Sequence, residues 1–166
     1  MPDPELAGLS PRPLEQLILP VLPLRLDDRL AGAAERLAEA GGGLPVVDAE
    51  GRLAGYLSER ELLAAMFPAY LQELRHTEFL TKDFPSLVRR ARDAADKPVG
   101  ELMDSKGEPV FIDADDSESH AAELFLHERV RTLPVVDAER RVIGVVRAVD
   151  VVRSLLRACG RQGVSA

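Results

Sequence analysis

Several features that would narrow the chemistry of a protein are scarce in this sequence. The only cysteine, Cys159, excludes an internal disulfide and offers no metal-ligand spacing, which fits a reducing cytoplasm. The 21 Lys and Arg face 28 Asp and Glu, and a net charge of -7 disfavours binding to the phosphates of nucleic acids or anionic membranes. The most apolar early stretch, residues 14–24, is too short and too rich in proline to span a bilayer. We therefore expect a cytoplasmic protein without a nucleic-acid or membrane partner.

Histidine, serine and glycine, on which many enzyme sites depend, are present but not at the spacings that metal, catalytic or phosphate-binding sites need. His120 and His127 stand two helical turns apart, about 10 Å along the axis, which is too far for one metal ion. Ser58 and Ser117 have no histidine and acid at a recognisable spacing, and the glycine run at residues 41–43 precedes a predicted strand rather than a helix. We expect no catalytic residues, no metal site and no required cofactor, and hence not an enzyme.

The dominant feature that is present is an internal duplication. Residues 44–62 read LPVVDAEGRLAGYLSEREL and residues 133–151 read LPVVDAERRVIGVVRAVDV, matched without a gap at a constant offset. A repeat of this length turns the fold into two similar halves that must pack together.

Each half is predicted to have the order β-α-β-β-α, an α+β fold. In the first, a strand near residues 21–26 leads to a helix that Asp27 or Asp28 can N-cap, and a hairpin follows. Ser58 then opens a helix. The second half repeats the order with a strand at 109–112, a helix capped by Asp115 or Asp116, strands at 130–137 and 142–146, and a helix over 148–158.

The connector between the halves is longer than a plain loop. We expect two short helices in it, and its basic cluster at Arg89, Arg90 and Arg92 is interpreted as a solvated helix face. The predicted organisation is a first repeat at 14–67, a helical connector at 68–98, a second repeat at 99–158, and tails at 1–13 and 159–166.

The two copies together resemble a tandem pair of CBS domains, often called a Bateman module. The resemblance rests on a hydrophobic-Pro-Val-Val-Asp strand, a hydrophobic-x-Gly-hydrophobic-hydrophobic strand, and a Ser/Thr-x-x-Asp element at the next helix start. These elements correspond to residues 44–48, 53–57 and Ser58 to Glu61, and to residues 133–137, 142–146 and Arg147 to Asp150. The resemblance implies pseudo-symmetric repeats packed through their sheets, a homodimer, and a cleft between repeats for an adenosine-type ligand such as AMP, ADP or ATP.

In the second repeat, the resemblance implies that Asp150 binds the ribose hydroxyls. Arg147 stands where a hydroxyl is usual, and an arginine there can hold a phosphate bidentately, which favours a phosphorylated ligand. An exposed salt bridge or the preference for acids at helix starts would also explain Asp150. Residues expected around the base are Arg131, Thr132 and Leu133, with Val110 and Ile112 on the facing strand.

In the first repeat, Ser58 is retained but Glu61 replaces the aspartate, and its longer side chain can overshoot a ribose. The same two residues match a capping box, in which the hydroxyl and the carboxylate satisfy each other's backbone donors. Capping without a ligand therefore explains both.

We consider two alternative functions for a protein of this kind. The first is a non-catalytic regulatory module that binds an adenine nucleotide and signals its occupancy to an unidentified protein partner. The alternative is a ligand-free dimerisation or adaptor protein, in which the connector presents Tyr70, Leu71, Leu74 and Phe84 to another protein or to a second copy.

Overall fold

The computed structural model describes residues 10–67, 84–103 and 107–160. Contacts divide these residues into two compact units. The first-repeat unit comprises the described residues from Leu22 to Pro109 together with Arg140–Val142. The second-repeat unit comprises those up to Val21, from Val110 to Glu139, and from Ile143 onward. Each unit is therefore assembled from separate pieces of the chain.

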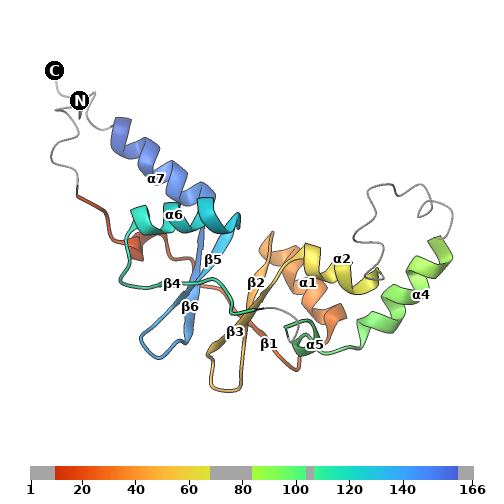
Figure 1. The fold of residues 1–166 in the computed structure, drawn as a ribbon. Coiled ribbons are helices and arrows are strands. Elements are labelled where there is room, and N and C mark those ends of the chain that lie inside the picture. Colours follow the sequence, from red (N-terminus) through yellow and green to blue (C-terminus); the bar gives the residue numbers. More distant parts are fainter. Residues whose placement is uncertain (1–9, 68–83, 104–106, 161–166) are drawn as a thin grey trace. The chain divides into compact units, whose positions relative to one another are not determined.

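The first-repeat unit has the predicted β-α-β-β-α order (Figure 1). Its three-stranded sheet runs β1-β2-β3, with β1 parallel to β2 and β2 antiparallel to β3. Helices α1 and α2 lie side by side next to this sheet, and apolar residues of α1, β2 and β3 form the core. The element bounds are β1 Leu24–Arg25, α1 Leu30–Ala40, β2 Leu44–Val47, β3 Leu53–Leu57 and α2 Glu59–Met66.

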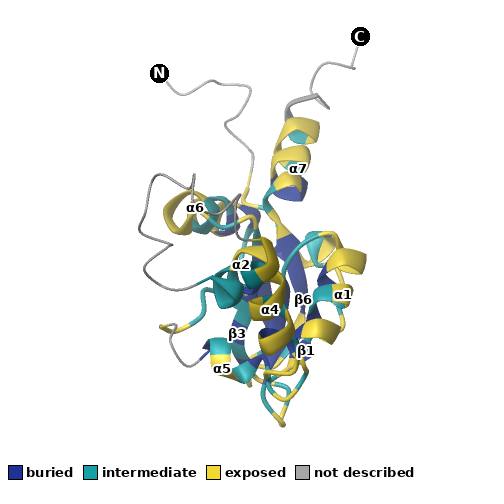
Figure 2. Cartoon of the chain, turned by 90° about the vertical axis from the view of Figure 1, so that its right-hand side faces the viewer, coloured by how far each residue is buried: buried dark blue, intermediate teal, exposed yellow. Residues whose placement is uncertain are grey.

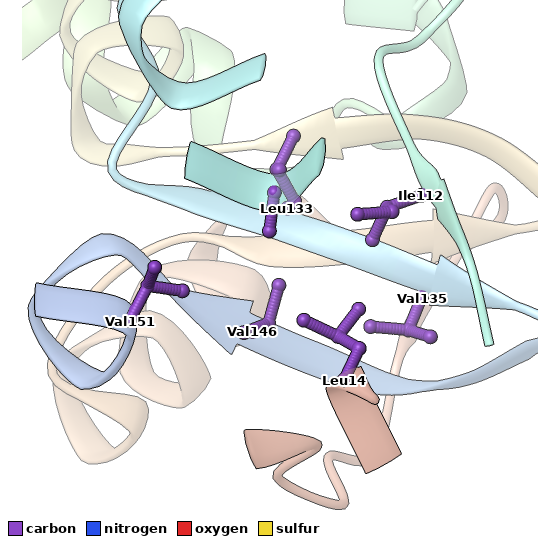
Figure 3. Close-up of a cluster of buried hydrophobic side chains, with 7 residues drawn as sticks. Leu14, Ile112, Leu133, Val135, Val146 and Val151 are labelled. Atoms are coloured by element: carbon purple, nitrogen blue, oxygen red, sulfur yellow. The ribbon is translucent and has the colours of Figure 1, made fainter. Parts of the chain in front are cut away.

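The second-repeat unit repeats this architecture, which confirms the α+β prediction. Its sheet runs β4-β5-β6, with β4 parallel to β5, and α6 packs against α7. Figure 3 shows the core side chains gathered around β5 and β6. The bounds are β4 Ile112–Asp113, α6 Glu118–Glu128, β5 Thr132–Val136, β6 Val142–Arg147 and α7 Ala148–Gly160. In both units burial follows the sheets, whereas α1, α4 and α7 carry exposed residues (Figure 2).

The connector contributes helix α4 (Phe84–Ala95), which packs on α1 and α2 in the first-repeat unit. Arg89, Arg90 and Arg92 are exposed on it, as expected of a solvated helix face. The other helix predicted for the connector, with Tyr70, Leu71 and Leu74, falls outside the described residues. Of the described helices, none has the length and apolar character needed to cross a membrane.

The helix caps of α1 and α6 differ from the prediction. Arg29, not Asp27 or Asp28, is the N-cap of α1, and Ser117, not Asp115 or Asp116, is the N-cap of α6. The aspartates instead stabilise the preceding turns. Asp28 Oδ2 accepts a hydrogen bond from the Arg25 backbone N–H at 2.8 Å, and Asp116 Oδ2 accepts one from the Asp113 N–H at 3.2 Å.

The segments that lead into the two repeats are exchanged between the units. The 3-10 helix η1 (Leu14–Leu17) precedes β1 in the chain but belongs to the second-repeat unit, where Leu14 is fully buried (Figure 3). Helix α5 (Gly100–Met103) precedes β4 but belongs to the first-repeat unit. Its Gly100 N–H donates to the Leu26 carbonyl at 2.8 Å. Compact units and sequence repeats therefore have different boundaries.

The repeated glycines of β3 and β6 lie where these lead-in segments cross. A Cβ on Gly55 would be 2.2 Å from Met103 Sδ, and a Cβ on Gly144 would be 2.5 Å from the Leu19 carbonyl oxygen. Leu19 also pairs with Val145 through backbone hydrogen bonds of 2.8 and 2.9 Å. Another segment thus approaches both glycines closely, with its backbone at Gly144 and with a flexible side chain at Gly55.

Two left-handed backbone positions are shared by the repeats but hold different residues. Gly41 ends α1 with φ 69°, and Arg129 ends α6 with φ 54°. In the hairpins, Gly51 has φ 81° and Arg140 has φ 66°. The first repeat therefore uses glycine where this conformation carries no Cβ strain, and the second repeat uses arginine despite that strain.

Candidate functional site

The start of α7 brings together Arg147 and Asp150, the two residues with the predicted ribose and phosphate roles. Arg147 is the last residue of β6, and Asp150 lies in the first turn of α7. Arg147 Nε donates to Asp150 Oδ2 at 2.6 Å and Nη2 donates to Oδ1 at 3.1 Å. The result is a bidentate, charge-assisted pair, the stronger class of side-chain hydrogen bond.

The two members of this pair differ in their exposure to solvent. The Asp150 side chain is 11% exposed and the Arg147 side chain 48% exposed, so the carboxylate is shielded while the cation reaches solvent. The hydrogen bond and the charge of Asp150 raise the pKa of Arg147 further above its already high value. Arg147 is therefore a permanent cation at the surface of the second-repeat unit.

A second cation, Arg153, was not among the predicted site residues. Its Nη1 lies 3.6 Å from Asp150 Oδ1. The signal was available in the sequence, because residues three apart on a helix are neighbours. Asp150 is thus flanked by an arginine before α7 and another within it.

The start of β5 forms the neighbouring edge of the candidate site. The Ala148 N–H, at the first residue of α7, donates to the Arg131 carbonyl at 3.0 Å, which joins the two segments. Arg131 is exposed and Thr132 half-buried, so both retain access to solvent.

The remaining predicted base-binding residues lie deeper. Leu133 and Ile112 are fully buried members of the core cluster (Figure 3). Val110 packs against that cluster. In this conformation the side chains of Leu133 and Ile112 have a packing role, and the solvent-accessible predicted residues are at the β5 start and the α7 start.

In the first repeat, Ser58 and Glu61 lie at the equivalent helix start and are tied to each other. Ser58 is the N-cap of α2, its backbone N–H donates to Glu61 Oε2 at 2.8 Å, and its hydroxyl also bonds to that carboxylate. The capping-box interpretation of these residues is confirmed. Both repeats therefore place an acid in the first helical turn and pair it with the residue three positions earlier, which is a serine in the first repeat and an arginine in the second.

A buried carboxylate, Glu118, was missed by the sequence reasoning. It lies at the start of α6, accepts a hydrogen bond from Ser154 Oγ at 2.9 Å, and forms an ion pair with Arg12 Nη2 at 3.3 Å. Arg12 Nη2 also donates to the Ser154 carbonyl at 2.6 Å. This network fastens the N-terminal segment to α6 and α7, and no local pattern could predict contacts so distant in sequence.

Metal binding has no support in the part of the chain that the structure describes, where no group of three or more His, Cys, Asp or Glu residues is arranged to hold an ion.

Comparison with known proteins agrees with the duplicated fold. The family model described as the CBS domain matches residues 17–68 and 99–157. The chloroplastic CBS domain-containing protein CBSX2 of Arabidopsis thaliana is 31% identical over 127 residues, which cover 69% of this chain and 50% of that protein. Its chloroplastic counterpart CBSX1 is 28% identical over a stretch of the same length. The chain thus spans about half the length of these curated relatives.

Solved structures show the same fold. A crystal structure of CBSX2 in complex with AMP has a TM-score of 0.65 and 28% identity, covering 89% of this chain and 98% of that chain. Another crystal structure of CBSX2, described as a CBS-pair protein from Arabidopsis thaliana, has a TM-score of 0.70 and 27% identity over 90% of this chain and 97% of that chain.

Proposed function

The chain belongs to the CBS domain family, and from that membership we propose that it is a non-catalytic regulatory module that binds an adenosine-containing nucleotide at the start of α7. The observation that carries the proposal is the pairing of a shielded carboxylate, Asp150, with a solvent-facing cation, Arg147. A carboxylate can accept hydrogen bonds from two adjacent ribose hydroxyls, and a guanidinium matches a phosphate. The AMP complex of CBSX2 supports this ligand class.

Regulation would follow from differential affinity. A ligand changes a conformational equilibrium only by binding one arrangement more tightly than another, and the coupling is reciprocal. The nucleotide would bridge the β5 start and the α7 start, which the Ala148 to Arg131 hydrogen bond already joins. No cofactor is needed for this role, and the cytoplasmic location stays a prediction.

Isothermal titration calorimetry with AMP, ADP and ATP tests the proposal. We expect at least one nucleotide to bind the wild type, and Asp150→Ala to weaken that binding more than tenfold, as expected for loss of hydrogen bonds to a charged group. Glu61→Ala, at the equivalent position of the first repeat, is the matched control and should change affinity less than threefold. Absence of binding at millimolar nucleotide, or equal losses in both variants, would overturn the proposal.

A second candidate function is assembly without a ligand. It is favoured by the exposure of Phe84 and Val88, which stand four residues apart and therefore share one face of α4. Large exposed apolar side chains that gather on one face often mark an interaction site. As a homodimer interface, this face should lose self-association when Phe84 and Val88 are both changed to Glu, measured by sedimentation velocity. Arg90→Glu, on the opposite side of the same helix, is the control, and a dimer unchanged by the double substitution would exclude this face.

A further inference from the structure

Both oxygens of Asp150 are hydrogen-bonded in the absence of ligand. Arg147 donates to them at 2.6 and 3.1 Å, and Arg153 lies 3.6 Å from Oδ1. A ribose that donates to Asp150 must reach the same two oxygens, and with Arg147 in place only 11% of this side chain is exposed. Because so little of the carboxylate is open to further donors, binding at this site is a competition between the ribose hydroxyls and a guanidinium of the protein itself.

Arg147 reaches solvent but has no second side-chain partner in the described part of the chain. Its side chain is 48% exposed, and among the described residues its only side-chain partner is Asp150. Arginine cannot lose its proton under ordinary conditions. Displaced from Asp150 by a neutral ligand, Arg147 would remain a cation without a counter-ion.

We infer that Arg147 is a specificity-determining residue. In the free protein it is paired with Asp150, and it releases Asp150 to the ribose only when the ligand carries a phosphate with which the guanidinium can pair instead. The inference rests on the proposed nucleotide site and adds a mechanism of selection to it. A nucleoside must break the ion pair and leaves Arg147 without a counter-ion. A nucleotide replaces one bidentate pair with another, because the guanidinium fork fits phosphate as it fits carboxylate.

The equivalent helix start in the first repeat is built differently. There the acid, Glu61, accepts hydrogen bonds from the backbone N–H and the hydroxyl of Ser58 within a capping box. A neutral serine thus stands where the second repeat has Arg147, and opening the box would remove a helix cap. The exchange that we infer for Arg147 therefore concerns the second repeat.

The test compares adenosine with AMP on the same protein by isothermal titration calorimetry. In the wild type, AMP should bind far more tightly than adenosine. In Arg147→Ala, adenosine should bind about tenfold more tightly than to the wild type, because its competitor is gone, and AMP about tenfold more weakly, because its phosphate partner is gone. The preference for AMP should then fall by about two orders of magnitude. Arg147→Lys, which retains a cation without the fork, should fall between the two proteins.

The ratio of the two affinities makes the test independent of folding losses, since both ligands are measured on one variant. Arg157→Ala is the control, because it removes another exposed cation of α7 that lies near its C-terminal end, and it should change the ratio less than threefold. An unchanged ratio in Arg147→Ala, with nucleotide still binding, would overturn this inference alone. Failure of both ligands to bind the wild type would overturn the proposed function and this inference together.

Discussion

The two repeated glycines offer a matched pair of perturbations with unequal predicted costs. In Gly144→Ala, the new Cβ would lie 2.5 Å from the Leu19 carbonyl oxygen and 2.7 Å from Ile18 Cγ2. The first obstacle is backbone, so the Leu19 segment must move away from β6. In Gly55→Ala, the new Cβ would lie 2.2 Å from Met103 Sδ, which is the flexible end of a side chain.

The magnitudes follow from what each movement breaks. Shifting Leu19 loses the two backbone hydrogen bonds to Val145, which contribute about 1 kcal/mol each. Steric strain adds about 1 kcal/mol or more. We therefore expect Gly144→Ala to lower the free energy of unfolding by about 2–4 kcal/mol and Gly55→Ala by about 1 kcal/mol, for which a new Met103 rotamer is enough.

Urea denaturation followed by circular dichroism measures both losses. Met103→Ala in the Gly55→Ala background should relieve the clash, so the cost of Gly55→Ala should nearly vanish in that double-mutant cycle. The same Met103→Ala change should leave the cost of Gly144→Ala unaltered. Equal costs for the two glycine substitutions, or a larger one at Gly55, would refute the assignment of the lead-in segments.

Three further predictions concern the second-repeat unit. Leu14→Ala removes a fully buried core side chain and should cost about 2–5 kcal/mol, with faster amide hydrogen exchange in β5 and β6; unchanged exchange there would contradict the placement of Leu14 in that core. Arg129→Gly should raise the free energy of unfolding by about 1 kcal/mol by relieving the strained φ of 54°, whereas Gly41→Ala at the equivalent position of the first repeat should lower it. In thermal unfolding, the first variant should have a higher midpoint than the wild type and the second a lower one. Arg12→Ala leaves the buried Glu118 carboxylate without its ion-pair partner and should cost about 1–3 kcal/mol in urea denaturation, and adding Glu118→Gln should recover part of that loss; a neutral Arg12→Ala would argue against the pair.

The order of strands and helices was predictable because it depends on local pattern. The repeated strand, turn and glycine fixed the β-α-β-β-α order, and the Ser58 to Glu61 spacing identified a real capping box. The caps of α1 and α6 were wrong because an aspartate beside a turn can bond to the turn or to the helix, and Asp28 and Asp116 bond to the turn. The choice depends on geometry that residue type does not encode.

The exchange of the lead-in segments could not be predicted for a related reason. The segments at 14–18 and 99–103 have similar apolar patterns, so either could cover either sheet, and periodicity does not distinguish the two arrangements. At the candidate site, the spacing of Arg147 and Asp150 predicted that the two residues are neighbours. It left open whether their side chains contact a ligand or each other. The hydrogen-bond distances of 2.6 and 3.1 Å show that in this structure they bind each other.

The network around Glu118 has a consequence for the order of folding during synthesis. Arg12 and Ser154 are separated by 142 residues, so at about 5–20 residues per second the ribosome makes the first about 7–30 s before the second. Leu14 likewise precedes the strands β5 and β6 that bury it. The earliest part of the described chain therefore completes its contacts last, and until then its apolar side chains are open to chaperones, to proteases and to neighbouring nascent chains.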